Sequence, residues 1–184
     1  VGSEMCKRAS PTPVPRMIAH RGLAEDHDEN TLTAFRRALD AGADVIETDT
    51  RATADGVALT FHDASTGRLA CDDYMVERTR YSTLEGLGIG SGTITRLEDA
   101  LTAFPHARFN IDVKSMHAAL PTARAIASHD AVQRVCLASF DGRVAACVRD
   151  AIRDLTGMEP TMSASRSTVQ AFRAAVAVGA PQSV

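Results

Sequence analysis

The sequence predicts an α/β fold in which helices flank a mainly parallel sheet. Short apolar runs that end in polar residues alternate along the chain with segments of helical periodicity, and this alternation is typical of parallel sheets. The chain has 184 residues, of which 45% are hydrophobic. It is therefore long enough for one compact domain with a sizeable core.

The first elements can be assigned in chain order. Residues 1–15 are rich in Pro, Ser and charge and are expected to form a disordered lead-in. The apolar run at residues 16–20 predicts a buried strand. A helix then opens at Asn30 or Thr31, and the pair Ala41–Gly42 closes it.

Two further strands and a long connection follow. Residues 45–50 and 57–61 read as strands, with Asp55–Gly56 as the turn between them. Residues 64–92 are too many for an ordinary connector and predict an excursion or a functional loop. The part at 86–92 contains a GxGxG pattern, but no strand leads into it and no helix opens within it. We therefore expect a flexible loop there and not a dinucleotide-binding turn.

The second half of the chain repeats the alternation. Thr95 is expected to cap a helix that runs to Phe104, with Glu98 at the capping-box position. The remaining elements follow from the same patterns and cover residues 108–113 (strand), 120–129 (helix), 135–139 (strand), 142–155 (helix), 161–163 (strand) and 168–178 (helix).

Charge and cysteine usage exclude some classes of protein. Lys and Arg total 20 and Asp and Glu total 23, a formal net charge of −3, so the basic field of a nucleic-acid-binding protein is missing. No apolar stretch approaches the roughly 20 residues of a membrane span. Reduced cysteines are favoured over two disulfides for Cys6, Cys71, Cys136 and Cys147, which also lack metal-binding spacing. A cytoplasmic location is favoured, and secretion with a removed signal stays open.

Charged side chains share one face on two of the predicted strands. Strand alternation places Glu47 and Asp49 on one side of the first strand. On the later strand, Asp112 and Lys114 share one face and aliphatic residues the other. Because the outer face of a helix-covered parallel sheet must be apolar, these charges must face inward. Buried ionisable groups are costly unless they are paired or metal-bound, so the pattern indicates a site.

The connection from Asp49 to His62 is too short for a crossover helix. The chain must run back in extended form and turn at Asp55–Gly56, which should return His62 to the level of Asp49. Each of these motifs alone has an ordinary explanation, such as a solvated strand face or a salt-bridged sheet edge. Their common place near the C-terminal ends of parallel strands is where (β/α)₈ barrels carry their chemistry.

A series of short motifs links these residues into one pattern. In chain order they are His20-Arg21-Gly22, Glu29-Asn30-Thr31, Gly42-Ala43-Asp44, Glu47-Thr48-Asp49, Asp55-Gly56, His62-Asp63, the helix segment 94–101, and Asn110-Ile111-Asp112-Val113-Lys114. In order and spacing they resemble the glycerophosphodiester phosphodiesterase family. The resemblance implies a (β/α)₈ TIM-barrel fold and an enzyme that hydrolyses small-molecule glycerophosphodiesters to glycerol phosphate and an alcohol.

Three departures from the family pattern qualify these expectations. Asp28 stands where the family has Pro, and the third carboxylate is Asp112 where the family usually has Glu. The chain also contains no Trp and reaches only about six strands, so we expect a barrel domain over residues 16–184 that is truncated after about six strands. An open barrel exposes two sheet edges, which predicts a fragment or self-association with another copy.

The resemblance also implies roles for the site residues. His20 and His62 would be the acid–base pair, which suits histidine because its ordinary pKa is about 6.5. Arg21 and Lys114 would hold phosphate oxygens. In the family the glycerol hydroxyl beside the phosphate can attack first and give a cyclic intermediate.

A divalent cation is part of the same expectation. Glu47, Asp49 and Asp112 would be its ligands, and oxygen-only ligands favour Ca²⁺ or Mg²⁺ over zinc. Asp112 is one methylene shorter than the usual Glu, which would shift the metal or admit a water.

Three further residues are expected to support the site. Glu29 would support the mouth or approach the metal, and Asn30 reads equally well as a helix cap. Asp63 would orient His62 or its loop. His117 is close to Lys114 in sequence, but a surface position is favoured for it.

Other functions stay open on the sequence alone. The chain could be a catalytically inactive domain of the same fold that binds a phosphate ligand or a partner. A relative that cleaves lysophospholipids would favour an exposed apolar rim, which residues 64–92 do not clearly provide. A plain structural α/β domain would leave the inward charge on two strands unexplained.

Overall fold

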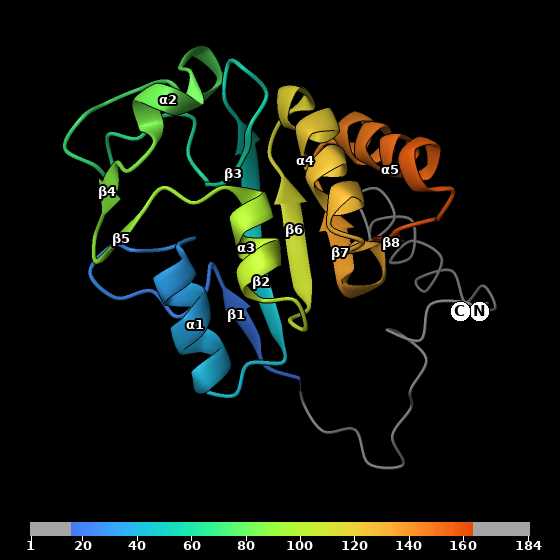
Figure 1. The fold of residues 1–184 in the computed structure, drawn as a ribbon, viewed down its shortest axis with the longest axis horizontal. Coiled ribbons are helices and arrows are strands. Elements are labelled where there is room, and N and C mark those ends of the chain that lie inside the picture. The colour runs from blue at the N-terminus through green and yellow to red at the C-terminus, as the bar shows by residue number, and fades with distance from the viewer. Residues whose placement is uncertain (1–15, 164–184) are drawn as a thin grey trace, which may run out of the picture.

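The computed structural model describes residues 16–163, so the predicted lead-in at 1–15 and the helix predicted at 168–178 lie outside the described residues. Its main sheet has six strands in the order β1-β2-β6-β7-β8, with β3 attached to β2 (Figure 1). These strands are β1 (Ile18–His20), β2 (Val45–Ala52), β3 (Ala58–Thr60), β6 (Phe109–Val113), β7 (Val135–Ala138) and β8 (Thr161–Met162). Neighbours along the path are parallel, and β3 alone runs antiparallel to β2. The described residues therefore form part of a (β/α)₈ barrel wall, with β3 as a return strand.

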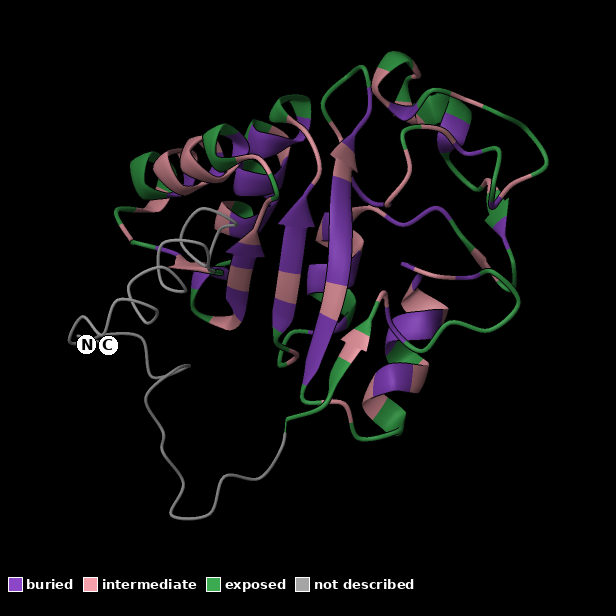
Figure 2. Cartoon of the chain, turned by 180° about the vertical axis from the view of Figure 1, so that it is seen from behind, coloured by how far each residue is buried: buried purple, intermediate pink, exposed green. Residues whose placement is uncertain are grey.

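The helices between the parallel strands pack on one face of this sheet (Figure 1). They are α1 (Leu32–Asp40), α3 (Leu97–Ala103), α4 (Met116–Ser128) and α5 (Gly142–Thr156). Phe109, Ile111 and Leu137 are fully buried in the core on this side, as strand alternation predicts. Figure 2 shows the sheet from behind, where no helix of the described chain lies over β2, β6 and β7. The charged residues of the predicted site belong to this uncovered face.

Two helix starts differ from the sequence expectation. The N-cap of α3 is Arg96, which makes no side-chain capping bond, so the capping box expected from Thr95 and Glu98 is wrong. The Thr95 hydroxyl instead donates to the carbonyl of Thr93. Helix α4 begins at Met116 and not at Leu120, because the Ser115 side chain caps it by accepting from the backbone N–H of Ala118.

The stretch at residues 64–92 is folded. It contains η1 (Val76–Arg78), the short helix α2 (Tyr81–Leu84), and a hairpin of β4 (Gly88–Ile89) and β5 (Gly92–Thr93). The flexible loop expected at 86–92 is thus wrong. At Gly90 a Cβ atom would lie 2.2 Å from the carbonyl oxygen of Asp26, so the glycines serve the close approach of the hairpin to the loop before α1.

Side chains from β3 and Phe61, from the excursion at residues 64–92 and from Ile94 form a second apolar cluster. Its buried members are Leu59, Phe61, Leu69, Val76, Leu84, Ile89 and Ile94. The cluster joins β3 to the excursion and anchors the segment that follows His62.

Strands β1 and β8 end the described sheet, and Met17 and Ile18 are exposed at the β1 end. The expected self-association along these edges stays a prediction. Cys71 and Cys147 are free thiols, in line with the reduced state favoured from the sequence. Among the helices of residues 16–163, none has both the length and the apolar character that crossing a membrane requires.

Candidate active site

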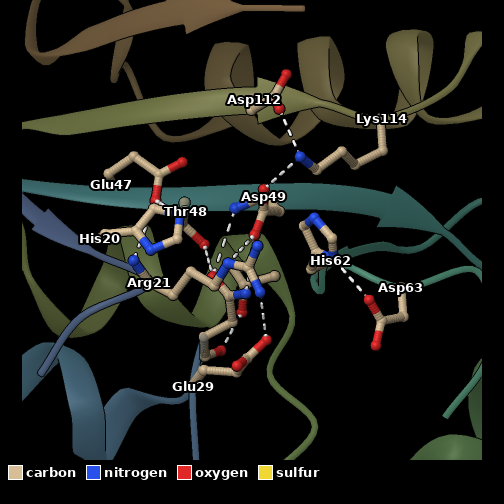
Figure 3. A network of polar contacts seen from close by, with 12 residues as sticks. His20, Arg21, Glu29, Glu47, Thr48, Asp49, His62, Asp63, Asp112 and Lys114 are labelled. Atoms are coloured by element: carbon tan, nitrogen blue, oxygen red, sulfur yellow. Dashed lines mark hydrogen bonds and ion pairs between the residues drawn. The ribbon is translucent and has the colours of Figure 1, made fainter. Parts of the chain in front are cut away.

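The predicted site residues lie together along β2 and at the C-terminal ends of β1, β3 and β6 (Figure 3). The predicted return of the chain after β2 is confirmed, because β3 pairs antiparallel with β2 and the backbone N–H of Phe61 donates to the carbonyl of Asp49 at 3.0 Å. His62 therefore follows β3 at the level of Asp49. The parallel register sets Glu47 beside Asn110 and Asp49 beside Asp112.

Asp49 lies at the centre of the network and is almost fully buried. Its Oδ1 lies 2.7 Å from Nζ of Lys114, and its Oδ2 lies 3.2 Å from Nε of Arg21. The side-chain amide of Asn30 donates to the same Oδ2 at 3.1 Å. A buried carboxylate with two cationic neighbours and an amide donor is well compensated.

Lys114 bridges two carboxylates of neighbouring strands. Its Nζ donates to Oδ2 of Asp112 at 2.5 Å, in addition to its contact with Asp49. Burial by itself would lower the pKa of Lys114, but the hydrogen bonds to Asp112 and Asp49 outweigh burial and raise it. The ammonium group is therefore firmly charged in this site.

Glu47 is less well compensated than Asp49. Its Oε2 accepts from the backbone N–H of Arg21 at 3.0 Å and lies 3.9 Å from Nε2 of His20. Burial raises the pKa of Glu47, and the nearby charge of Asp49 raises it further. The His20 side chain is 73% exposed, so a solute can reach its ring.

The turn after β1 holds Arg21 in an uncommon conformation. Arg21 has φ of 59° and Gly22 has φ of 81°, which for arginine lies in the sparsely populated left-handed region. From this turn the guanidinium of Arg21 reaches Glu29, and its Nη1 donates to Oε1 of Glu29 at 2.8 Å. Glu29 therefore contacts Arg21, and its expected role in supporting the mouth or approaching a metal stays a prediction.

Asn30 does not cap the helix, so that interpretation is wrong. The N-cap of α1 is Thr31, whose side chain accepts from the N–H of Ala34. Asn30 has φ of 60° and is buried. Its Oδ1 accepts from the Thr48 hydroxyl at 2.7 Å while its amide reaches Asp49. Its short polar side chain suits both the left-handed backbone and the buried bonds.

His62 and Asp63 form a close pair at the end of β3 (Figure 3). Nδ1 of His62 lies 2.6 Å from Oδ1 of Asp63, so the pairing expected of Asp63 is present. Burial alone would raise the pKa of Asp63, but hydrogen bonds from Arg68 and His62 outweigh burial and lower it. This contact engages Nδ1 and does not involve Nε2, the other ring nitrogen. His117, in contrast, is exposed as expected.

Two arginines of the site were missed by the motif reasoning. Arg68 lies in the excursion and contacts both Glu29 and Asp63. Arg51 continues the inner face of β2, and its Nε donates to the carbonyl of His62 at 2.8 Å. Strand alternation could have found Arg51, since it shares a face with Asp49. Nothing in the local pattern around Arg68 signals its partners.

The carboxylates do not form a ready-made metal cage. Within residues 16–163, no group of three or more His, Cys, Asp or Glu side chains stands in a metal-binding arrangement. The ammonium of Lys114 lies between Asp49 and Asp112 instead. Unpaired oxygens remain, however, because Oδ1 of Asp112 and Oδ1 of Asn110 are buried without a hydrogen bond in the described structure. These oxygens and the Glu47 carboxylate are of the type that hard divalent cations bind.

Known proteins match most of the described chain. The model of the glycerophosphoryl diester phosphodiesterase family matches residues 20–159. A probable glycerophosphodiester phosphodiesterase of Mycobacterium tuberculosis is 38% identical over 128 residues, which are 68% of this chain and 48% of that protein. The crystal structure of a glycerophosphodiester phosphodiesterase from Agrobacterium tumefaciens gives a TM-score of 0.70 at 25% identity, over 82% of this chain and 67% of that one.

A third match comes from a structure with a bound product. An Oleispira antarctica phosphodiesterase in complex with sn-glycerol-3-phosphate gives a TM-score of 0.66 at 21% identity, over 87% of this chain and 71% of that one. At this identity the likeness concerns the fold. The chain spans about half the length of the Mycobacterium relative, and the region matched to the family contains every site residue described above.

Proposed function

We propose that this chain, which belongs to the glycerophosphoryl diester phosphodiesterase family, hydrolyses glycerophosphodiesters to glycerol phosphate and an alcohol. The observation that carries the proposal is the convergence of His20, Arg21, His62 and Lys114 around the buried carboxylate of Asp49. Phosphodiester hydrolysis needs charge stabilisation on the phosphate and proton transfer at two oxygens. These residue types supply both.

Two histidines can move the protons. One takes the proton of the glycerol hydroxyl as that oxygen bonds to phosphorus, and the other gives a proton to the alcohol oxygen as its bond to phosphorus breaks. Water then opens the resulting cyclic phosphate with the proton transfers reversed. The exposed ring of His20 and the Asp63-held ring of His62 support these roles.

Arg21 and Lys114 are proposed to hold the phosphate oxygens. Both are cationic groups that already contact Asp49, so a phosphate would compete with that carboxylate for them. An arginine fork binds two oxygens at once, whereas a lysine acts as a point charge. The remaining carboxylate charge therefore needs another cation.

That cation is proposed to be Ca²⁺ or Mg²⁺, held by Glu47, Asp49 and Asp112. The unpaired Oδ1 of Asp112 and the raised pKa of Glu47, due to burial and Asp49, support the proposal. When bound, a divalent ion polarises a phosphoryl oxygen. Asn110, whose Oδ1 is also unpaired, lies beside Glu47 in the sheet register.

The experiment is hydrolysis of glycerophosphocholine with added Ca²⁺ or Mg²⁺. We expect the unmodified chain to be active and both His20→Ala and Glu47→Ala to lose at least about 100-fold in rate. His106→Ala is the matched control, because His106 is an exposed histidine without a site contact. Equal rates for the chain, His20→Ala and Glu47→Ala would sink the proposal.

One observation favours a lysophospholipid as a second candidate substrate. Phe140 follows β7 at the same end of the sheet, is 76% exposed, and has its ring centroid 5.6 Å from Nζ of Lys114. Met116, the first residue of α4, is also exposed after β6, so exposed apolar side chains follow two of the parallel strands. Phe140→Ser should weaken cleavage of lysophosphatidylcholine more than that of glycerophosphocholine. Equal effects on the two substrates would remove this candidate.

A further inference from the structure

Arg68 joins two acidic residues that hold different parts of the site. It lies in the segment after β3, and its guanidinium contacts both carboxylates at once. Nη1 and Nη2 lie 3.2 and 2.6 Å from the two oxygens of Glu29, and Nε lies 2.5 Å from Oδ2 of Asp63. The planar fork of an arginine can serve two carboxylates in fixed directions, which a lysine ammonium cannot.

Each of these two carboxylates also contacts a residue that is proposed to act in catalysis. Oδ1 of Asp63 lies 2.6 Å from Nδ1 of His62. Oε1 of Glu29 accepts from Nη1 of Arg21 at 2.8 Å. A continuous line of contacts therefore runs from His62, at the end of β3, through Arg68 to Arg21, at the end of β1.

The positive charge of the Arg68 guanidinium compensates the negative charges of both carboxylates. The side chains of Glu29 and Asp63 are 15% and 25% exposed, so solvent screens them poorly. Burial alone would raise the pKa of each carboxyl, but the hydrogen bonds from Arg68, with those from Arg21 and His62, outweigh burial and lower both pKa values. Without Arg68, the carboxylates of Glu29 and Asp63 would lose their shared cation and would be held by Arg21 and His62.

We infer that Arg68 is a positioning residue, which fixes the ring of His62 through Asp63 and the guanidinium of Arg21 through Glu29. Its catalytic meaning rests on the proposed function. A neutral His62 that donates its Nδ1 proton to Asp63 presents a bare Nε2, the form that can accept a proton. Arg68 holds Asp63 in the place where it selects that form.

A purely structural latch is the competing role for Arg68. The excursion, however, has its own anchors, since Leu69 and Val76 are buried in the second apolar cluster and Ser65 pairs with Met75. The guanidinium of Arg68 reaches out of this segment to Glu29 and Asp63. A latch would change stability but would not set the proton position on His62.

The decisive measurement is the tautomer of His62, read from the ¹⁵N chemical shifts of its ring while the imidazole is neutral. His62→Gln assigns the signals. We expect one Nδ1–H form in the unmodified chain, a mixture of tautomers in Arg68→Ala, and partial recovery in Arg68→Lys. Arg96→Ala is the matched control and should match the unmodified chain, because Arg96 also bridges two carboxylates, those of Glu98 and Asp99, at the start of α3.

Kinetics on glycerophosphocholine provide the second arm. Arg68→Ala should lower kcat by roughly tenfold to a hundredfold through His62 and raise KM through Arg21, with Arg68→Lys between it and the unmodified chain. An Arg68→Ala chain that keeps the unmodified tautomer overturns the inference, even if it is less stable. Without any hydrolysis by the unmodified chain the proposed function fails, whereas the tautomer still decides the role of Arg68.

Discussion

Nζ of Lys114 lies 2.7 Å from Oδ1 of Asp49, which places a cation of the chain itself against the most buried carboxylate of the site. The same ammonium lies 2.5 Å from Oδ2 of Asp112 on the neighbouring strand. Lys114 therefore pairs with two of the three carboxylates that are proposed to hold a metal, and its single charge offsets half of theirs. Under the proposed function, Lys114 would couple the stability of the metal-free chain to the binding of a divalent ion and of phosphate.

Removing that charge should destabilise the metal-free chain. Lys114→Gln leaves Asp49 and Asp112 buried without their shared cation, and breaking such a pair costs about 3–5 kcal/mol of unfolding free energy. Urea denaturation measures the loss, and added Ca²⁺ or Mg²⁺ should recover part of it. Lys114→Arg is the control that keeps the charge. A Lys114→Gln chain as stable as the unmodified one would contradict the prediction.

Glu47 should limit stability at neutral pH when no metal is bound. Its pKa is raised by burial and by Asp49, so the folded chain binds this proton more tightly than the unfolded chain. Stability should therefore fall as pH rises from the ordinary Glu pKa through the raised one. Glu47→Gln lacks this ionisation and keeps an acceptor for the N–H of Arg21, so its thermal midpoint at pH 7 should be higher. A lower thermal midpoint for Glu47→Gln at pH 7 would contradict the prediction that ionised Glu47 limits stability.

Much of this site follows from strand alternation, and the rest depends on contacts distant in sequence. The inward faces of Glu47 and Asp112 and the return of His62 were predictable, because a period of two and a short connection leave few options. Arg68 was not, since its partners are set by how the excursion folds over its apolar cluster. From the sequence, the side chain of Asn30 could cap the helix or support the site, and only the packing of α1 decides between these two roles.

Asn30 combines a backbone role with a hydrogen-bonding role, and two substitutions separate them. Asn30→Gly keeps the φ of 60° but removes the bonds to Thr48 and Asp49, which should cost about 1–3 kcal/mol. Asn30→Ala loses the same bonds and also strains the left-handed backbone, for a further loss of about 1 kcal/mol. Chemical denaturation of both variants tests this order. If alanine is tolerated as well as glycine, the backbone contribution is absent.

Gly22 should be far less replaceable than Gly56, although both have φ of 81°. A Cβ on Gly22 would lie 2.8 Å from the carbonyl carbon of Ala34, whereas a Cβ on Gly56 meets nothing within 4 Å. Both alanine variants carry the same backbone penalty, so their difference reports the close contact with α1. We expect Gly22→Ala to lose about 1–3 kcal/mol more than Gly56→Ala in unfolding free energy. Similar losses would mean that α1 gives way easily.

The contact between Asp63 and His62 should matter for turnover more than for substrate binding. Asparagine at position 63 can turn its amide toward Nδ1 of His62, which favours the tautomer with the proton on Nε2 and removes the proton acceptor. With tautomer selection lost, kcat for glycerophosphocholine should fall by roughly 10²–10⁴ while KM changes little.

The lowered pKa of Asp63 adds a stability test, because a carboxylate with a depressed pKa stabilises the fold above its unfolded pKa and loses that effect as pH falls through the folded one. The stability gap between the unmodified chain and Asp63→Asn should therefore shrink on acidification. An unchanged kcat would show that the pair has no part in proton transfer, whatever the stability gap does.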